Sequence, residues 1–233
     1  LRNNPESRFF SKKGLILGGS HSPSPLNSEA HQGDLSAVLL QNLNPLVNLI
    51  RVPKKPIILM DEWESKIKAI VENTWNKDVN SLSGVPSWML VLIKAVLKKT
   101  GREYLTDVWP NLEVFFHGGI SFEPYREQYK TLIPSNKMHY METYNASEGF
   151  FGLQDDPTDS SLLMMPDYGI FYEFIPMNEV GNAHPTVLPL ESVETGKNYA
   201  MVITTSGGLW RYSLINLSSP DVPSTLSTPL ARS

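Results

Sequence analysis

The sequence predicts an α/β fold that is followed by a mainly antiparallel β portion. Between residues 1 and 155, short apolar runs that end in glycine alternate with segments whose apolar residues recur at helical spacing. Beyond Phe150, short aromatic and β-branched runs are separated by turn clusters. The chain has 233 residues, of which 41% are hydrophobic and 19% charged, so it can bury a sizeable core.

The first predicted elements are a strand, a loop and a helix. Residues 14–19 are an apolar run that closes on two glycines, which predicts a buried strand entering a tight turn. Residues 20–34 are rich in Ser, Pro and Asn, so we expect a loop without regular structure. A helix is expected within residues 35–50 and should end near Asn44, because Pro45 cannot continue it.

Two amphipathic or apolar segments predict longer helices. Residues 62–76 carry an apolar stripe, with Asp61 as the expected N-cap and Glu64 completing a capping box. Within this segment, residues 65–68 match the S-x-x-K pattern, but its partner motifs are absent and we expect both lysines on a solvated face. Residues 86–99 are apolar nearly all round, which predicts a deeply packed helix.

The middle of the chain repeats the order strand, glycine turn and helix. Residues 112–117 predict a strand, Gly118-Gly119 a turn and residues 124–132 a helix, which together are the elements of an α/β unit. A further strand is expected at residues 138–142. Five β runs follow, at 150–154, 162–165, 169–175, 198–205 and 209–212, and the Ser-, Pro- and Thr-rich residues 213–233 predict a tail.

Composition and charge exclude several classes of function. The 20 Lys+Arg and 24 Asp+Glu give a net charge of −4, and without a basic stripe we expect no nucleic-acid partner. The absence of cysteine excludes disulfides and Cys-ligated metals, and the 5 histidines are scattered. The longest apolar run, 88–93, is far shorter than the about 20 residues that cross a bilayer. We therefore expect a cytoplasmic protein with no membrane partner.

Two segments carry candidate binding chemistry. His117-Gly118-Gly119-Ile120-Ser121 ends a predicted strand, and its glycines allow a ligand to approach the backbone, although a tight turn explains them equally well. Thr143-Tyr144-Asn145-Ala146-Ser147-Glu148-Gly149 combines an aromatic ring, hydroxyls and a carboxylate, which suits a nucleobase, phosphates and Mg²⁺. Taken alone, this second segment is also compatible with a polar loop. Together they predict a ligand crevice at the carboxyl ends of adjacent strands.

The same region contains an ordered set of motifs: Ser83-Gly84-Val85-Pro86-Ser87-Trp88, Trp109-Pro110-Asn111-Leu112-Glu113, His117-Gly118-Gly119, Tyr125-Arg126-Glu127-Gln128-Tyr129 and Tyr144-Asn145-Ala146-Ser147-Glu148-Gly149. In this order and spacing they resemble bacterial members of the auxin-responsive promoter (Gretchen Hagen) family. That family of acyl acid amido synthetases belongs to the adenylate-forming superfamily, with firefly luciferase and acyl-CoA synthetases. The resemblance extends over residues 1–212.

The resemblance implies a two-step ligase. A small carboxylic acid would react with ATP and Mg²⁺ to give an acyl-adenylate, and an amine or amino acid would then accept the acyl group. By the same resemblance Tyr144 would flank the adenine, Ser147 would contact the nucleotide, and Glu148 would be the catalytic residue that holds Mg²⁺. Thr143, Asn145 and Ala146 would belong to the same nucleotide site.

Two further groups of residues follow from the resemblance. The turn at Gly118 and Gly119, with Ser121, would line the adenine and acyl pocket. The acyl site would be shaped by three residues that precede this turn: Ser83, Val85 and Trp88. Core packing explains Val85 and Trp88 equally well.

The sequence also departs from the family pattern. It lacks the phosphate loop, the Gly-Asp pair expected after Arg211-Tyr212, and the C-terminal lid domain with its lysine. We therefore expect an incomplete N-terminal large domain, with an α/β subdomain at 1–155, a β-rich subdomain at 156–212 and the tail at 213–233. Such a fragment would be inactive alone, with a complementing polypeptide as a candidate partner. An acyl-CoA ligase and a non-catalytic interaction module are the alternatives.

Overall fold

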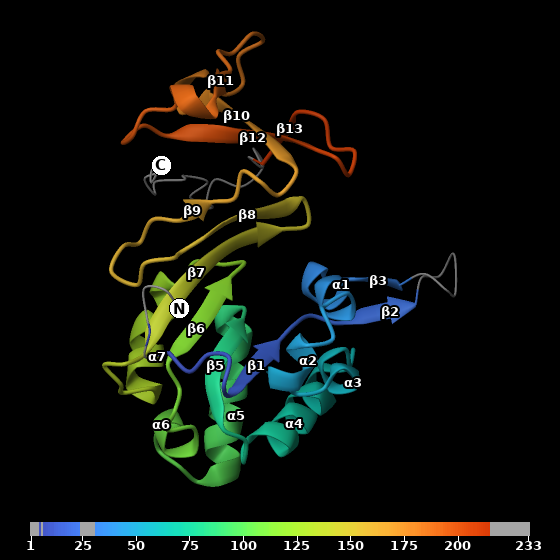
Figure 1. Cartoon of the computed structure of the whole chain (residues 1–233), viewed down its shortest axis with the longest axis vertical. Coiled ribbons are helices and arrows are strands. Elements are labelled where there is room, and N and C mark those ends of the chain that lie inside the picture. The colour runs from blue at the N-terminus through green and yellow to red at the C-terminus, as the bar shows by residue number, and fades with distance from the viewer. Residues whose placement is uncertain (1–4, 6, 24–30, 215–233) are drawn as a thin grey trace. The chain divides into compact units, whose positions relative to one another are not determined.

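A computed structural model of the chain describes residues 5, 7–23 and 31–214. The chain forms two compact units, with the boundary between Met141 and Glu142 (Figure 1). Among the described residues, no helix combines the length and the apolar character that a bilayer crossing requires.

Parallel strands form the centre of the first unit. β1 (Lys13–Leu17) lies between β4 (Arg51–Val52) and β5 (Val79–Gly84), and β6 (Val114–Gly118) follows on the other side of β5. β7 (His139–Ala146) starts beside this group, where the His139 amide donates to the Glu113 carbonyl. The predicted strands at 14–17 and 112–117 are thereby confirmed, and the parallel order agrees with the predicted α/β class.

Helices connect these strands and carry much of the core. The first unit contains α1 (Leu35–Gln41), α2 (Val47–Ile50), α3 (Lys55–Ile58), α4 (Trp63–Thr74), α5 (Pro86–Thr100), α6 (Leu105–Val108), the 3-10 turn η1 (Glu123–Tyr125) and α7 (Arg126–Leu132). The predicted helix at 86–99 is confirmed in α5. It ends at Gly101, whose φ of 67° is the left-handed conformation that glycine adopts readily.

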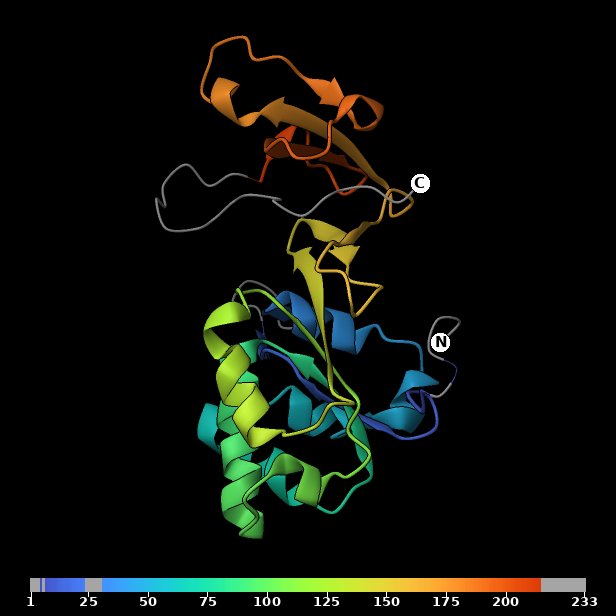
Figure 2. The ribbon, with the colours of Figure 1, turned by 90° about the vertical axis from the view of Figure 1, so that its left-hand side faces the viewer.

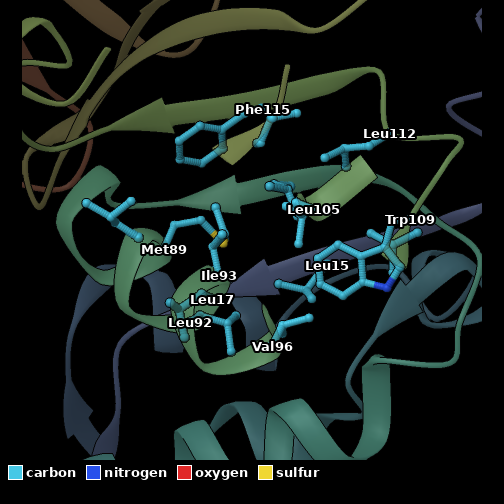
Figure 3. Packing of buried hydrophobic residues seen from close by; sticks show 14 of the residues in the cluster. Leu15, Leu17, Met89, Leu92, Ile93, Val96, Leu105, Trp109, Leu112 and Phe115 are labelled. Carbon is cyan, nitrogen blue, oxygen red and sulfur yellow. The ribbon is translucent and has the colours of Figure 1, made fainter. Parts of the chain in front are cut away.

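One hydrophobic cluster joins the parallel strands to α4, α5 and α7. Leu15 of β1 and Phe115 of β6 belong to it, together with Met89 and Ile93 of α5, and none of these four side chains is exposed (Figure 3). Burying a side chain of this size stabilises the fold by about 1.5–3 kcal/mol. This buried cluster therefore fixes the positions of the strands and of their carboxyl ends.

Two local predictions for the first unit are wrong. Residues 20–34 are not free of regular structure, because β2 (His21–Pro23) and β3 (His31–Gly33) pair antiparallel. The N-cap of α4 is Glu62, not Asp61. Its carboxylate accepts hydrogen bonds from the backbone amides of Glu64 at 2.9 Å and Ser65 at 2.6 Å. A glutamate can replace the shorter cap residues here because both of its oxygens reach the first turn.

The prediction that residues 65–68 form a solvated lysine face is wrong for Lys66. Its side chain is only 2% exposed, whereas Lys68 is exposed as expected. Lys66 lies one helical turn before Ile70 and so belongs to the buried face of α4. Its Nζ atom donates to the carbonyl oxygens of Gly18 at 2.8 Å and Gly19 at 3.0 Å.

The second unit is mainly antiparallel, as predicted. β7 pairs with β8 (Gly149–Leu153), which pairs with β9 (Leu163–Met164). A separate sheet has the order β11-β10-β12-β13, formed by β11 (Leu188–Pro189), β10 (Ile170–Pro176), β12 (Tyr199–Thr205) and β13 (Tyr212–Ser213). The 3-10 turns η2 (Met177–Glu179) and η3 (Leu190–Ser192) lie between these strands in the chain.

The two long strands of this sheet, β10 and β12, run side by side (Figure 2). Phe174 and Ile203 are completely buried in the core of the second unit. Ser213, the first residue of the predicted tail, lies in β13, and residues 215–233 of that tail lie outside the described residues.

Candidate functional site

Three parallel strands of the first unit end in one row. The register places Leu17 of β1 opposite Gly84 of β5, and Gly84 opposite His117 of β6. Each strand runs directly into glycine or ends on it, and the carboxyl ends of such strands are where open α/β sheets bind ligands. Gly84 has a φ of 154°, and a Cβ atom there would lie 2.7 Å from the Leu17 carbonyl oxygen. The close approach of β1 and β5 therefore requires glycine at position 84.

The predicted acyl-site residues follow this row on β5 and α5. Ser83 is in β5, Val85 is the N-cap residue of α5, and all three residues of the set, including Trp88, are partly buried. The Trp88 ring lies 5.6 Å from the ring of Trp63, the first residue of α4. Trp63 was not among the predicted site residues, because its partner is distant in sequence.

The glycine turn after β6 comes close to Val85. Gly118 is the last residue of β6, and Gly119 has a φ of 83°. A Cβ atom built on Gly119 would lie 3.6 Å from Cγ2 of Val85, so the structure brings these two predicted site residues together. Ser121 is exposed beyond the turn.

His117, immediately before this turn, is buried and neutral at ordinary pH. Its side chain is 3% exposed and stacks on Phe122, with ring centroids 4.3 Å apart. Burial, followed by the positive charge of Arg126, lowers the pKa of His117 from 6.5 to about 4. The neutral ring fixes the start of the glycine turn through packing.

The predicted polar loop 143–149 is a β-hairpin, which corrects the sequence interpretation. Thr143 to Ala146 belong to β7 and pair with β8, with an irregularity in register between Tyr144 and Asn145. Only Ser147 and Glu148 lie between the strands, as a two-residue turn. β7 continues through this segment because β8 supplies a partner strand. The composition of one segment alone does not show that pairing.

The hairpin places an aromatic ring and a carboxylate near each other. Tyr144 is partly buried, with its ring 5.0 Å from that of Phe151. Burial, and then the negative charge of Glu148, raise the pKa of Tyr144. Ser147 is exposed at the tip, and the Thr143 hydroxyl lies 3.5 Å from the Asn145 side-chain oxygen. The segment thus presents one phenol, short polar side chains and one carboxylate.

Glu148 presents a single, partly exposed carboxylate in the turn between β7 and β8. In the part of the chain that the structure describes, no group of three or more His, Cys, Asp or Glu side chains forms a metal cage. Mg²⁺ in nucleotide sites is characteristically held by one or two carboxylates together with substrate phosphates and water. The partly exposed Glu148 at the hairpin tip can supply one such carboxylate.

Parallel strands with glycine-rich ends, followed by antiparallel sheets, form a fold that is also found in an acyl acid amido synthetase and a CoA ligase of known structure. The structure is similar to that of a 2-hydroxyisobutyryl-CoA ligase in complex with 2-HIB-AMP and CoA, with a TM-score of 0.53 and 12% identity, covering 87% of this chain and 42% of that one. It is also similar to the GH3.15 acyl acid amido synthetase, with a TM-score of 0.67 and 17% identity over 88% of this chain and 44% of that one.

The chain belongs to the GH3 family. Residues 4–138 match the GH3 family N-terminal domain and residues 163–217 match the GH3 family central domain. A relative, the indole-3-acetic acid-amido synthetase GH3.4 of Arabidopsis thaliana, is 29% identical over 161 residues, which cover 64% of this chain and 25% of the relative. The chain therefore spans about a quarter of the length of that curated relative.

Proposed function

We propose that this chain carries nucleotide- and acyl-binding elements of an ATP-dependent acyl acid amido synthetase. The observation that carries the proposal is the hairpin, in which Tyr144 of β7 and Glu148 of the two-residue turn, both part of the family motif, belong to one short structural element. In this proposal the Tyr144 ring flanks the adenine, and the Ser147 hydroxyl donates a hydrogen bond to the nucleotide. Gly118, Gly119 and Ser121 line the adenine and acyl pocket, and Ser83, Val85 and Trp88 shape the acyl site.

The proposed reaction has two displacements. A carboxylate oxygen attacks the α-phosphorus of ATP, and the bond to pyrophosphate breaks. The lone pair of an amine then attacks the acyl carbonyl, AMP leaves, and the amine loses a proton. Mg²⁺, held by Glu148, would neutralise phosphate charge, and the remaining acceleration would come from the positioning of the reactants. The expected substrates are a small carboxylic acid and an amine or amino acid.

Calorimetric titration of the purified chain with ATP and Mg²⁺ tests the site. We expect weak binding to the wild type and a loss of at least tenfold in affinity in the Tyr144→Ala, Glu148→Ala double variant. The matched control is Tyr168→Ala, which removes a tyrosine that is 62% exposed on the same unit. Wild-type affinity in the double variant would refute the assignment of the site.

A second measurement tests catalysis by the chain alone. We propose that residues 1–233 bind nucleotide without turnover and that a complementing polypeptide would supply the rest of the site. The assay is pyrophosphate release with ATP, Mg²⁺ and a carboxylic acid. Release by the purified chain above a no-enzyme control would contradict the proposed lack of turnover.

An acyl-CoA ligase is the second candidate, because the fold is also similar to that of a CoA ligase. The two candidates differ in the acceptor of the acyl group. With the complementing polypeptide present, an amide product formed from an amino acid supports the synthetase, whereas a thioester formed with CoA supports the ligase.

A further inference from the structure

The turn after β1 lies beside the segment that the proposed function assigns to the acyl acid. Leu17 is opposite Gly84, which directly precedes Val85. A side chain at position 84 would meet the Leu17 carbonyl oxygen at 2.7 Å, so the backbones touch at this point. The Gly18-Gly19 turn continues from Leu17. It therefore begins beside Gly84, next to the segment of the proposed acyl site that contains Val85.

Three side chains hold this turn. The Lys66 ammonium donates to both glycine carbonyl oxygens, at 2.8 and 3.0 Å. On the other side, the Gly19 amide donates to the Ser36 hydroxyl at 2.7 Å, and the Ser20 amide donates to the Asp34 carboxylate at 3.1 Å. A Cβ atom on Gly19 would lie 2.0 Å from Asp34 Oδ2, so this packing tolerates only glycine.

Burying the ammonium group of a lysine in a hydrophobic core costs free energy. Lys66 is 2% exposed, and the other buried residues of α4 include Ile67, Ile70 and Val71. Burial lowers the pKa of Lys66, and the negative charge of Asp34 offsets part of this decrease. Since apolar residues often replace buried charges without loss of stability, packing alone does not account for lysine at this position. Its donors fix the orientation of two backbone carbonyls.

We propose that Lys66 is a positioning residue that holds the Gly18-Gly19 turn as a further wall of the acyl-acid site, beside Val85. This inference rests on the proposed function. The acid would contact the backbone of the turn, and Lys66 would act through the turn without touching the acid. Preorganised backbone of this kind is supported by side chains behind it, which is the place that Lys66 occupies.

Amide hydrogen exchange in the ligand-free chain tests the support that Lys66 gives. In Lys66→Met we expect exchange at Gly19 and Ser20 to be at least tenfold faster, while the buried Leu82 of β5 stays within threefold. Lys66→Arg keeps a donor and a charge and should restore most of the protection. Lys68→Met, on the exposed face of the same helix, is the matched control and should leave the exchange rates unchanged. Unchanged exchange in Lys66→Met would overturn the proposal.

Backbone amide shifts on addition of indole-3-acetate with ATP and Mg²⁺ test the contact with the acid. We expect shifts at Gly18, Gly19 and Val85 in the wild type, and shifts at the two glycines that are at least halved in Lys66→Met. Shifts at Val85 and Gly119 without any at Gly18 and Gly19 would overturn this inference and leave the proposed function standing. No shift anywhere would refute both.

A second variant covers the case in which Lys66→Met does not fold. Ser36→Ala removes the acceptor of the Gly19 amide from a partly exposed position and loosens the same turn from the opposite side. We expect faster exchange at Gly19 and smaller acid-induced shifts at Gly18. Wild-type exchange and wild-type shifts in this variant would contradict a ligand role for the turn.

Discussion

Burial of His117 should make the stability of the first unit depend on pH. The folded chain holds this histidine neutral, because its pKa is lowered from 6.5 to about 4. The unfolded chain binds the proton near pH 6.5 and the folded chain only near pH 4. The unfolded state therefore takes up more protons as the pH falls, and the free energy of unfolding decreases through this interval. Above about pH 6.5 both states are neutral and the stabilising contribution is fully present.

The size of the effect follows from the same two pKa values. The interval from 6.5 to about 4, at about 1.36 kcal/mol for each pH unit, corresponds to about 3 kcal/mol. At pH 5 the unfolded form is almost fully protonated and the folded form almost fully neutral, so about 2 kcal/mol of this total is already lost.

Urea unfolding at pH 7.5 and pH 5 measures this loss. The wild type should lose about 2 kcal/mol more than His117→Gln between the two pH values, because carboxylates contribute equally to both chains. His139→Gln is the matched control, since His139 is exposed, and it should follow the wild type. The reasoning is refuted if His117→Gln loses as much stability as the wild type.

Three further predictions concern packing and backbone geometry. Gly84→Ala should lower the free energy of unfolding by about 3 kcal/mol or more, because a strained φ is combined with a clash against the Leu17 carbonyl oxygen. Gly101→Ala should lower it by only about 1 kcal/mol, since nothing lies within 4 Å of its Cβ position, and urea unfolding compares the two variants. Phe174→Ala should lower the free energy of unfolding by about 3–5 kcal/mol, because Phe174 is completely buried. Phe171 is 63% exposed, so Phe171→Ala should lower it by about 0.5 kcal/mol or less, and equal effects in thermal melts would contradict the assigned core. Tyr129→Phe removes the hydroxyl that donates to the Pro86 carbonyl at 2.7 Å and should cost about 1–3 kcal/mol, a loss that the exposed Tyr168→Phe should not reproduce in the same urea assay.

The elements that the sequence predicts well are those with a strong local signal. α5 has Pro86 in its first turn, lysines in its last turn and Gly101 directly after it, so its bounds follow from residues within or next to the helix. The strands that begin at Lys13 and Val114 are short apolar runs bounded by glycine, and they too are recognised from local pattern.

Two of the predictions that are wrong concern segments that pair with a second strand. The hairpin at 143–149 extends β7 because β8 pairs with it, so a segment that is polar in isolation becomes a strand. The short pair β2 and β3 is likewise created by antiparallel pairing between its two strands. Local composition favours a loop in both segments, and pairing with the neighbouring strand overrides it.

Lys66 illustrates why the candidate site was only partly predictable. Its neighbours in sequence are Ser65 and Ile67, and a lysine beside another at position 68 suggests a solvated face. The helical period, however, places position 66 in line with Ile70, and the two carbonyls that accept its hydrogen bonds are 47 and 48 residues away. The glycines at the edge of the proposed site are similarly remote from one another in sequence: 18–19, 84 and 118–119.

The register of three strands brings into one row the strand ends at which those glycines lie. Because β1 and β5 approach until a Cβ atom at Gly84 would collide with backbone, neither turn can move without disturbing the other. A side chain that fixes one turn, as Lys66 does for Gly18 and Gly19, therefore restrains its neighbour as well. The geometry of the proposed acyl site then depends on a residue that lies behind it, and substitutions at position 66 should act on ligand binding through backbone position.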